Sequence, residues 1–246
     1  MLVLPAIDIM GGQCVRLLKG RPEESRVYHQ DPLDAALRWE QEGAGALHLV
    51  DLDRALGGKP NSDAVRRIVD SVTVPVQLGG GLRSREAVKE AFGSGVWRVV
   101  MGTAALRSRD LLCWCLDRFG DRVVVALDHR EDRVVVSGWT QEHGLSLKEA
   151  TETLLEQGVR EVLATAVERD GTMEGPDLAG LAILVRSGLR VIASGGVTRL
   201  EDLRDLAGLP NLTGVVIGRA LYEGVLSLGE VLRVSRGEGR LDCERG

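Results

Sequence analysis

Short aliphatic runs recur along the whole chain, and each run is bounded by a glycine or a polar residue. Most runs are followed by a stretch in which apolar residues lie three and four positions apart, as on one face of a helix. Continuous apolar strands that alternate with amphipathic helices are typical of a parallel sheet whose outer face is covered. The predicted strands are Leu2–Ile7, Ala46–Val50, Val74–Leu78, Arg98–Met101, Val123–Leu127, Glu161–Ala166, Arg190–Ala193 and Gly214–Ile217. The predicted helices are Pro32–Glu42, Ser62–Ser71, Ser84–Phe92, Leu111–Phe119, Ser146–Gln157, Asp177–Ser187 and Arg199–Ala207.

The number of these units predicts the architecture. Eight strands that alternate with helices in 246 residues match a (β/α)8 TIM barrel, which typically takes about 250 residues as one domain. No low-complexity segment and no linker rich in Pro and Ser divides the chain. We therefore expect an α/β protein in which residues 1–246 form a single barrel domain.

The two halves of the chain resemble each other. The string VPVQLGGGLRS is similar to LRVIASGGVTR, RVVMGTAAL is similar to GVVIGRALY, and PAID is similar to VALD, at offsets of 115, 116 and 120 residues. A chance match between glycine-rich strings explains one such pair easily but explains three in the same order poorly. The sequence therefore predicts two related half-barrels, at approximately 1–120 and 121–246.

Composition narrows the class of protein. Hydrophobic residues make up 44% of the chain and charged residues 27%, which is enough for both a buried core and a solvated surface. Aromatic residues are only 3%, so aliphatic side chains must fill the barrel. The formal net charge of −5 gives no basic footprint for a nucleic acid, and we expect no nucleic-acid partner.

No segment predicts a membrane partner or export. The longest stretch free of charged residues, Leu206–Gly218, is shorter than the about 20 apolar residues that cross a bilayer. Asp8 comes too early for a signal peptide. The four cysteines, Cys14, Cys113, Cys115 and Cys243, do not have the spacing of a metal site. Cys113 and Cys115 flank Trp114 in an apolar segment that fits a buried helix face. We expect a cytoplasmic protein without a metal site.

Glycine-rich turns follow the third and fourth strands of each predicted half. Glycine lets backbone N–H groups approach an anion, and the start of the next helix adds positive potential. Tight strand-to-helix turns are the alternative for any one of these motifs. Because the motif occurs twice, we expect two phosphate sites on opposite sides of the barrel mouth and a substrate phosphorylated at both ends. The predicted phosphate-binding residues are Gly80, Gly81, Gly102, Thr103, Ser194, Gly195, Gly196, Gly218 and Arg219.

Two aspartates are duplicated in the same way. Asp8 and Asp128 each come directly after the first predicted strand of a half. Acids at the carboxyl ends of barrel strands are typical of catalytic residues, and two carboxylates in different surroundings can divide the roles of acid and base. The alternative is that they cap helices or brace loops.

Seven strings together resemble one enzyme family. They are PAIDIMGGQCVRLLKG, HLVDLDRA, QLGGGLRS, GWTQEHG, ERDGTMEGPD, ASGGV and VIGRALYEG. Over Met1 to about Gly229, the chain is similar to the histidine-biosynthesis isomerases that act on phosphoribosylformimino-aminoimidazole-carboxamide ribotide (ProFAR). The resemblance implies an Amadori rearrangement, in which an aminoaldose becomes an aminoketose within a bisphosphorylated substrate.

The resemblance also implies roles for particular residues. Asp8 matches the family's general base, and Asp128 matches its general acid, which protonates the ring oxygen as the sugar opens. Thr165 matches a threonine that assists by hydrogen bonding, and Asp170 matches the aspartate of a DGT motif. Aldose–ketose chemistry requires an acid and a base rather than a redox cofactor, so we expect no cofactor.

Three further residues match substrate-binding positions of the family. Arg16 matches an arginine that reaches the substrate, with a surface arginine as the alternative. His48 either lines the site or is a satisfied barrel histidine. Trp139 either stacks on the aminoimidazole ring or packs permanently at the barrel rim. Arg16 and Trp139 lie in two segments that are long enough to fold over the mouth as lids, Gly11–His29 and Arg130–His143.

The chain departs from the family at Ala166, where an acid is common, and at Arg54, where a small residue is common. The first departure leaves no second acid beside Thr165. The remaining histidines carry no motif, and we expect them at solvated loop positions: His29, His129 and His143.

Three other functions are open alternatives. One is an isomerase that acts on phosphoribosylanthranilate as well as ProFAR, and another is the cyclase subunit of imidazole glycerol phosphate synthase. That cyclase characteristically begins PCLDVKDGRVVKG, whereas this chain has PAIDIMGGQCVRLLKG. The third, a non-catalytic phosphosugar-binding barrel, would gain nothing from two carboxylates near an anionic ligand. We expect the protein to work as a monomer.

Overall fold

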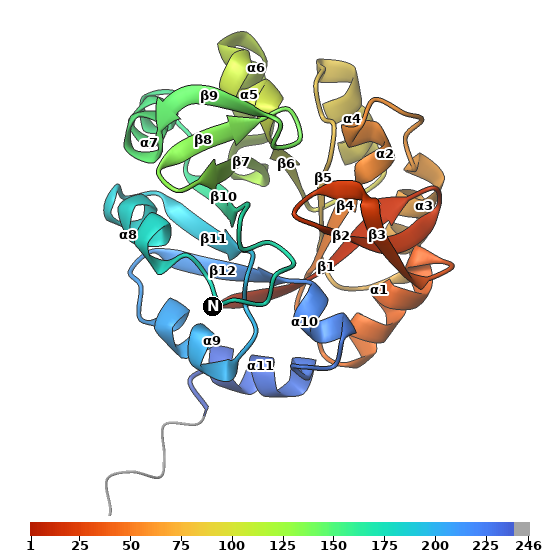
Figure 1. Ribbon diagram of the computed structural model, residues 1–246. Helices are drawn as coiled ribbons and strands as arrows, with labels where there is room; N and C mark the ends of the chain where they lie inside the picture. Colours follow the sequence, from red (N-terminus) through yellow and green to blue (C-terminus); the bar gives the residue numbers. More distant parts are fainter. Residues whose placement is uncertain (239–246) are drawn as a thin grey trace, which may run out of the picture.

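Eight parallel strands close into a ring at the centre of the computed structural model, which describes residues 1–238 (Figure 1). Neighbouring strands pair in the order β1, β4, β5, β6, β7, β10, β11 and β12, and the pairing of β12 with β1 completes the ring. The (β/α)8 barrel is confirmed. The barrel strands are β1 (Leu2–Met10), β4 (Leu47–Asp51), β5 (Val76–Gly79), β6 (Arg98–Met101), β7 (Val123–Arg130), β10 (Glu161–Ala166), β11 (Arg190–Ser194) and β12 (Leu212–Ile217).

Helices form the layer outside the ring (Figure 1). The longer ones are α1 (Pro32–Gln41), α3 (Ser62–Ser71), α4 (Arg85–Gly93), α6 (Arg109–Phe119), α7 (Leu147–Glu156), α8 (Leu178–Arg186), α9 (Leu200–Ala207) and α11 (Leu228–Ser235). Short helices follow three of the strands: α2 (Leu52–Ala55), α5 (Thr103–Arg107) and α10 (Arg219–Tyr222). The 3-10 turn η1 (Gly120–Arg122) lies between α6 and β7. The structure leaves Cys243 outside the described residues. In α6, Cys115 is buried and Cys113 is half-buried, which confirms the predicted helix but only partly the predicted burial.

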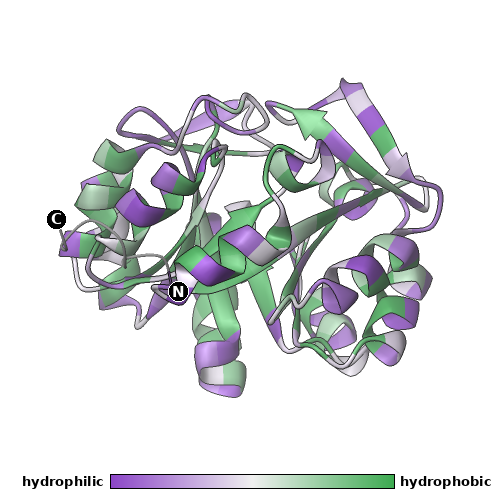
Figure 2. Ribbon diagram, turned by 90° about the horizontal axis from the view of Figure 1, so that it is seen from below, coloured by the Kyte–Doolittle hydropathy of each residue, from purple (hydrophilic) through white to green (hydrophobic). Residues whose placement is uncertain are grey.

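Several helices begin at a residue whose side chain binds a free N–H group of the first turn. In α7, Ser146 accepts a hydrogen bond from the backbone of Glu149, and the Glu149 carboxylate accepts one from the backbone of Ser146. Each such cap stabilises a helix by about 1 kcal/mol. Each of the longer helices buries one apolar face toward the strands. Figure 2 shows mostly hydrophobic strands at the centre, surrounded by helices that also carry hydrophilic residues.

Apolar side chains fill the protein in two layers. The larger layer lies between the strands and the helices and includes Ile7, Leu49 and Trp39. The smaller layer lies inside the barrel and contains few large side chains: Leu4, Ala6, Ala46, Val100, Val124, Leu163, Ile192 and Val216. Burial on both faces explains why the barrel strands are continuous apolar runs.

Two antiparallel hairpins occupy the predicted lid segments. The first consists of β2 (Gln13–Leu18) and β3 (Arg21–His29), and the second of β8 (Arg133–Val136) and β9 (Gln141–Ser146). Each continues a barrel strand, because β2 pairs with β1 and β8 pairs with β7. None of these four strands is among those predicted from the sequence. The exposed residues of β3 and β9 give no apolar run that would have indicated them.

These hairpins correct the predicted position of the two aspartates. Asp8 and Asp128 lie within β1 and β7 rather than just beyond them, because both strands extend past the barrel rim into the hairpin pairing. Both side chains nevertheless face the barrel mouth. Among residues 1–238, no helix has the length and apolar character needed to cross a bilayer.

Candidate active site

A cavity of about 260 Å³ opens at the carboxyl ends of the barrel strands. A narrow pocket adjoins it, and both are lined by Arg16, Asp170, Ser194 and Val216. The predicted site residues that line the cavity are Asp8, Arg16, His48, Gly80, Gly81, Gly102, Thr103, Asp128, Trp139, Thr165, Asp170 and Ser194. Those that line only the adjoining pocket are Gly195, Gly196, Gly218 and Arg219. The fold thus gathers all of them in one region.

Asp8 and Asp128 lie on opposite sides of this cavity. In the ring, three strands separate β1 from β7 along either path. A molecule held between the two carboxylates would therefore have one on each face. This arrangement suits a reaction in which one group removes a proton and another supplies one.

Asp8 is held by the first hairpin. One guanidinium nitrogen of Arg16 lies 2.9 Å from the Asp8 carboxylate, and another lies 3.9 Å from the carboxylate of Asp170. Burial raises the pKa of Asp8 to about 6, although the Arg16 charge opposes the rise. Burial also raises the pKa of Asp170, and Arg16 again opposes it. At neutral pH, Asp8 is a carboxylate whose affinity for a proton is increased, as a general base requires.

Asp128 has different partners. The indole N–H of Trp139, from the second hairpin, donates a hydrogen bond of 2.8 Å to Asp128 Oδ2. Thr165 is the residue paired with Asp128 on the neighbouring strand, β10, and its hydroxyl bonds the same carboxylate. Burial raises the pKa of Asp128 above its ordinary value, and the hydrogen bonds from Trp139 and Thr165 offset only part of this rise. A raised pKa favours the protonated form that a general acid needs.

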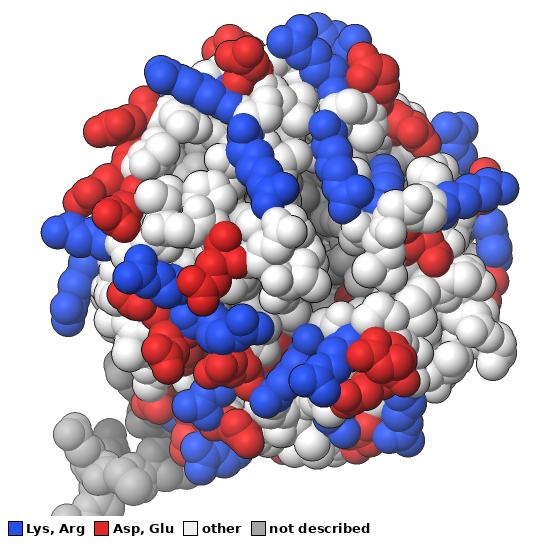
Figure 3. Space-filling model, turned by 45° about the horizontal axis from the view of Figure 1, so that its top comes forward, with Lys and Arg blue, Asp and Glu red and all other residues white. Residues whose placement is uncertain are grey.

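The glycine turns lie at two places on the rim. Gly80 and Gly81 follow β5 next to the Gly102–Thr103 turn, and Gly195 and Gly196 follow β11 next to the Gly218 turn. At the second place, a side chain on Gly218 would collide with the Arg16 guanidinium, so Arg16 lies directly against this turn. Figure 3 shows basic side chains bordering a hollow in this face of the molecule. The positive charge complements a substrate with two anionic groups.

The comparisons with known proteins identify the family of the chain. A model of the family described as histidine biosynthesis protein matches residues 2–227. The chain belongs to the histidine biosynthesis protein family. A relative from Desulforudis audaxviator is 48% identical over 97% of this chain and 92% of its own length. A relative from Synechocystis sp. is 43% identical over 98% and 95%, and one from Caldanaerobacter subterraneus is 38% identical over 97% and 100%.

Each of these relatives is named 1-(5-phosphoribosyl)-5-((5-phosphoribosylamino)methylideneamino) imidazole-4-carboxamide isomerase, the systematic form of ProFAR isomerase. The resemblance predicted from the seven strings is therefore confirmed. Arg83 also lines the cavity, although it is not among the predicted site residues, and its guanidinium donates to the backbone carbonyl of Ala55. The string QLGGGLRS contained it, directly after the glycines that drew attention.

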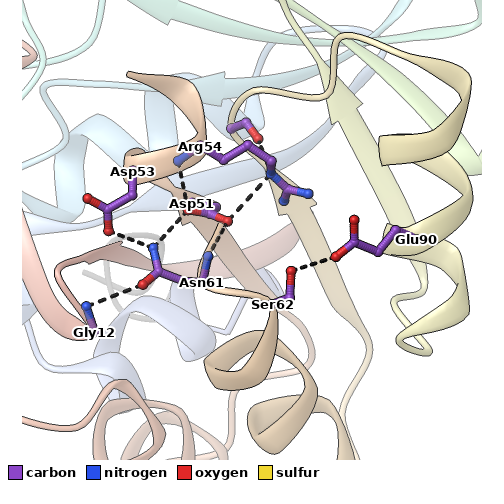
Figure 4. Close-up of polar contacts among 8 residues, drawn as sticks. Gly12, Asp51, Asp53, Arg54, Asn61, Ser62 and Glu90 are labelled. Atoms are coloured by element: carbon purple, nitrogen blue, oxygen red, sulfur yellow. Dashed lines mark hydrogen bonds and ion pairs between the residues drawn. The ribbon is translucent and has the colours of Figure 1, made fainter. Parts of the chain in front are cut away.

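Arg54, one departure from the family pattern, supports the first glycine turn. Its side chain is 9% exposed, and its Nε–H donates 3.0 Å to the carbonyl oxygen of Gly80. The buried Asp51 carboxylate lies 3.4 Å from that nitrogen and also accepts from the backbone N–H of Arg54. Figure 4 shows this cluster. The larger residue thus acts as a brace between the loop after β4 and the turn at Gly80.

The same cluster reaches the base of the first hairpin. Asn61 donates from its side-chain amide to both Asp51 and Asp53 at 2.8 Å. Asp53 accepts from the backbone N–H of Gly11. Asn61 accepts from that of Gly12 (Figure 4). One polar network therefore ties the hairpin that carries Arg16 to the loop that supports a glycine turn.

Ala166 and His129, which adjoin Thr165 and Asp128 in the sequence, are both buried. Ala166 is buried at the end of β10, so the site has no second acid beside Thr165. The expectation of a solvated His129 is wrong: the residue is 1% exposed, and its Nδ1 lies 2.9 Å from the carbonyl oxygen of Glu131. The ring is buried against the start of α8, where a side chain on Gly180 would collide with it and the Asp177 carboxylate lies 3.7 Å from Nδ1.

Gly196 is expected to be indispensable to the second turn. A Cβ at this position would overlap with the carbonyl oxygen of Gly175, and the backbone φ of +86° strains any other residue. Gly196→Ala should lower the free energy of unfolding by at least about 2 kcal/mol. It should also weaken the rise in melting temperature that inorganic phosphate gives the wild type.

Gly188→Ala is the matched control, because Gly188 has a similar φ of +95° but open space around it. It carries the backbone strain without the collision and lies outside the site. Equal losses of stability and of phosphate response in the two variants would show that strain alone, rather than close approach at the turn, makes Gly196 necessary.

Trp139 is expected to act on substrate conversion partly through Asp128. Trp139→Phe keeps an aromatic ring but removes the N–H donor, so the pKa of Asp128 should rise further. The alkaline limb of the pH profile of kcat/KM should move to higher pH, while KM changes little. Trp139→Ala should also lose ring contacts and lower kcat/KM at least several-fold. If the alkaline limb does not move in Trp139→Phe, Trp139 does not influence the pKa of Asp128 during catalysis.

Proposed function

We propose that the protein is an aldose–ketose isomerase of histidine biosynthesis, which converts ProFAR to its ribulosyl form, PRFAR, by an Amadori rearrangement. One observation carries the proposal: Asp8 and Asp128 lie on opposite strands of a single cavity, between two glycine-rich turns. The cavity can therefore hold a molecule with two phosphates by its ends and present an acid and a base to its middle. The relatives named above carry this activity in their names.

In the proposed mechanism, protonated Asp128 gives its proton to the ring oxygen of the ribose next to the formimino nitrogen. The bond between that oxygen and the anomeric carbon breaks, and the nitrogen lone pair forms a protonated Schiff base. Asp8 then removes the proton from the adjacent ribose carbon, and the electrons of the C–H bond form an enolamine. Each of these proton transfers by a positioned side chain typically accelerates the reaction by about 10²–10⁴-fold.

The final step restores both aspartates. The enolamine becomes a ketone when the former anomeric carbon gains a proton, which Asp8 can return, and the neighbouring hydroxyl loses one, which Asp128 can accept. No atom is gained or lost overall. Thr165 and Trp139 hold the Asp128 carboxylate in place, Arg16 holds Asp8, and Asp170 holds Arg16.

The two anionic ends of the substrate would bind at the two pairs of turns. Gly80, Gly81, Gly102 and Thr103 would hold one phosphate, and Ser194, Gly195, Gly196, Gly218 and Arg219 would hold the other. The backbone N–H groups at these turns and the nearby Arg16 and Arg219 supply the donors. Trp139 would contact the aminoimidazole ring.

A coupled assay of the purified protein with ProFAR tests the proposal. We expect turnover of ProFAR and none of phosphoribosylanthranilate. Turnover of both would make the protein a bifunctional isomerase, and turnover of neither, by protein that is folded by circular dichroism, would refute the assignment. Production of imidazole glycerol phosphate from PRFAR and ammonia would instead identify the cyclase.

The proposal extends to the organisation of the chain. We propose two related half-barrels, approximately 1–120 and 121–246, in a single domain. Support comes from equivalent features after equivalent strands: an aspartate and a hairpin at β1 and β7, and glycine turns after β5 and β11.

We also propose a cytoplasmic monomer. Its three described cysteines are free, as in a reducing compartment. Size-exclusion chromatography should give the mass of one copy.

A further inference from the structure

A chain of polar side chains runs through the interior of the barrel beneath the cavity. His48 on β4, Gln77 on β5 and Arg98 on β6 are register partners on neighbouring strands, so their side chains point to the same side of the sheet. Gln77 Nε2 lies 2.7 Å from His48 Nδ1, and Arg98 Nε lies 2.6 Å from Gln77 Oε1. Of the three residues, only His48 lines the cavity.

Chemistry fixes the direction of each hydrogen bond in this chain. A guanidinium has only donors, so the Gln77 atom that faces Arg98 must be its carbonyl oxygen. The other end of the amide, the NH2 group, then faces His48 and must donate. His48 Nδ1 is therefore an acceptor without a proton, and a neutral His48 carries its proton on Nε2.

The surroundings also keep His48 neutral. The ring is 6% exposed, and the two charged groups that act on it, Arg16 and Arg98, are both cations. Burial, together with these two charges, lowers the pKa of His48 to about 3. Among the hydrogen bonds of residues 1–238, the His48 ring has one at Nδ1, with Gln77, and none at Nε2. The free N–H belongs to a side chain in the cavity wall.

The end of this side-chain network that lies away from the cavity anchors Arg98. One of its guanidinium nitrogens lies 2.9 Å from Glu161 Oε2, and Glu161 Oε1 accepts a hydrogen bond of 2.6 Å from the Thr213 hydroxyl. Both charged side chains are more than nine-tenths buried. A buried ion pair contributes little net stability compared with apolar residues, but it does fix the orientation of the groups bound to it. Here that group is the Gln77 amide.

We propose that Gln77, oriented by Arg98, is a positioning residue that sets the tautomer of His48, so that His48 Nε2–H donates a hydrogen bond to an oxygen of the sugar between Asp8 and Asp128. This inference rests on the proposed isomerase function for the identity of the acceptor. The tautomer itself does not depend on that function. A sugar oxygen is the acceptor because the cavity between the phosphate turns would hold the ribose.

Nitrogen NMR of protein labelled with ¹⁵N-histidine tests the tautomer. The resonances of His48 are identified by their loss in His48→Gln. In the wild type we expect a protonated Nε2 and an unprotonated Nδ1 that do not change between pH 5 and pH 8. In the wild type, a protonated Nδ1 or a titration of His48 between pH 5 and pH 8 would overturn the proposal.

Gln77→Glu reverses the direction of the bond to His48. A carboxylate can only accept, so it can bind Arg98 and draw a proton onto His48 Nδ1. We expect the Nδ1 signal of this variant to become that of a protonated nitrogen. Thr151→Val is the matched control, because it also removes the hydrogen bond of a buried threonine hydroxyl, to the carbonyl oxygen of Leu147, but lies in α7 outside this network. It should leave the His48 signals and kcat/KM unchanged. An Nδ1 that stays unprotonated in Gln77→Glu would refute the role of Gln77.

The kinetics of His48 variants test whether His48 Nε2–H donates a hydrogen bond to the substrate. His48→Leu removes the N–H, and kcat/KM for ProFAR should fall about tenfold, the loss expected for one hydrogen bond. His48→Gln places an amide N–H near the position of Nε2 and should recover most of that loss. Equal losses in the two variants would refute donation to the substrate. If the wild type does not turn over ProFAR, the proposed function fails while the NMR result still decides the tautomer.

Discussion

Replacing Asp8 with asparagine is expected to lower kcat by at least about a hundredfold, because a positioned general base contributes about 10²–10⁴-fold. Asparagine has nearly the same shape but cannot take a proton from the sugar. Its amide can still accept a hydrogen bond from Arg16, which lies 2.9 Å from the native carboxylate. Binding should therefore persist, and the loss should appear in kcat more than in KM.

The pH profile identifies Asp8 as the base. Its pKa is about 6, so kcat/KM of the wild type should fall as the pH decreases below 6 and the carboxylate becomes protonated. The residual activity of Asp8→Asn should lack this acid limb. Near-normal turnover in the variant, with folding confirmed by circular dichroism, would exclude Asp8 as the base.

The stability of the protein should report the same group. Because the pKa of Asp8 rises from 3.8 to about 6 on folding, the folded state binds more protons than the unfolded state between these values. Stability therefore falls as the pH rises through this window. The difference in melting temperature between wild type and Asp8→Asn should change across it, in the direction that favours the variant at higher pH.

Replacing Asp128 with asparagine is expected to have an effect of similar size, because it removes the proton that opens the sugar ring. The variant can keep its hydrogen bonds, since an amide oxygen accepts from Trp139 as the native carboxylate does at 2.8 Å. We expect kcat to fall at least about a hundredfold while circular dichroism and melting remain close to those of the wild type.

The two aspartates should differ in their pH limbs. The acid must be protonated, so loss of activity at high pH should disappear in Asp128→Asn, while the acid limb that reflects Asp8 remains. Their effects in the double variant should combine less than additively, because both groups act in one sequence of proton transfers. Full additivity, or an unchanged alkaline limb, would contradict the assignment of Asp128 as the acid.

Several parts of the fold were predictable because their cause is local. A strand buried on both faces must be an apolar run, and a helix against a sheet must repeat its apolar face, so the barrel strands and most of the longer helices appear in the pattern. The hairpins did not, because β3 is polar along most of its length and forms by pairing with β2. Short helices such as α2 and α10 were missed since four residues are too few for a periodicity.

The candidate site divides in the same way. Asp8, Asp128 and the glycine turns were found because they follow predicted strands in both halves, and parallel strands bring their carboxyl ends to one rim. Arg83 could have been found from its motif. Gln77 and Arg98 could not, because each is one polar residue inside or beside an apolar run, and nothing local says which atom it binds.

The sequence by itself therefore determined the barrel, the family, and the residues that meet at its mouth, because periodicity, glycine content and strand ends are properties of short segments. Only the tertiary structure decided how those residues act. Strand register placed Thr165 beside Asp128, and the hairpins brought Arg16 to Asp8 and Trp139 to Asp128. The pKa of each carboxyl and the proton on His48 depend on burial and on partners far apart in the chain, which only closure of the ring brings together.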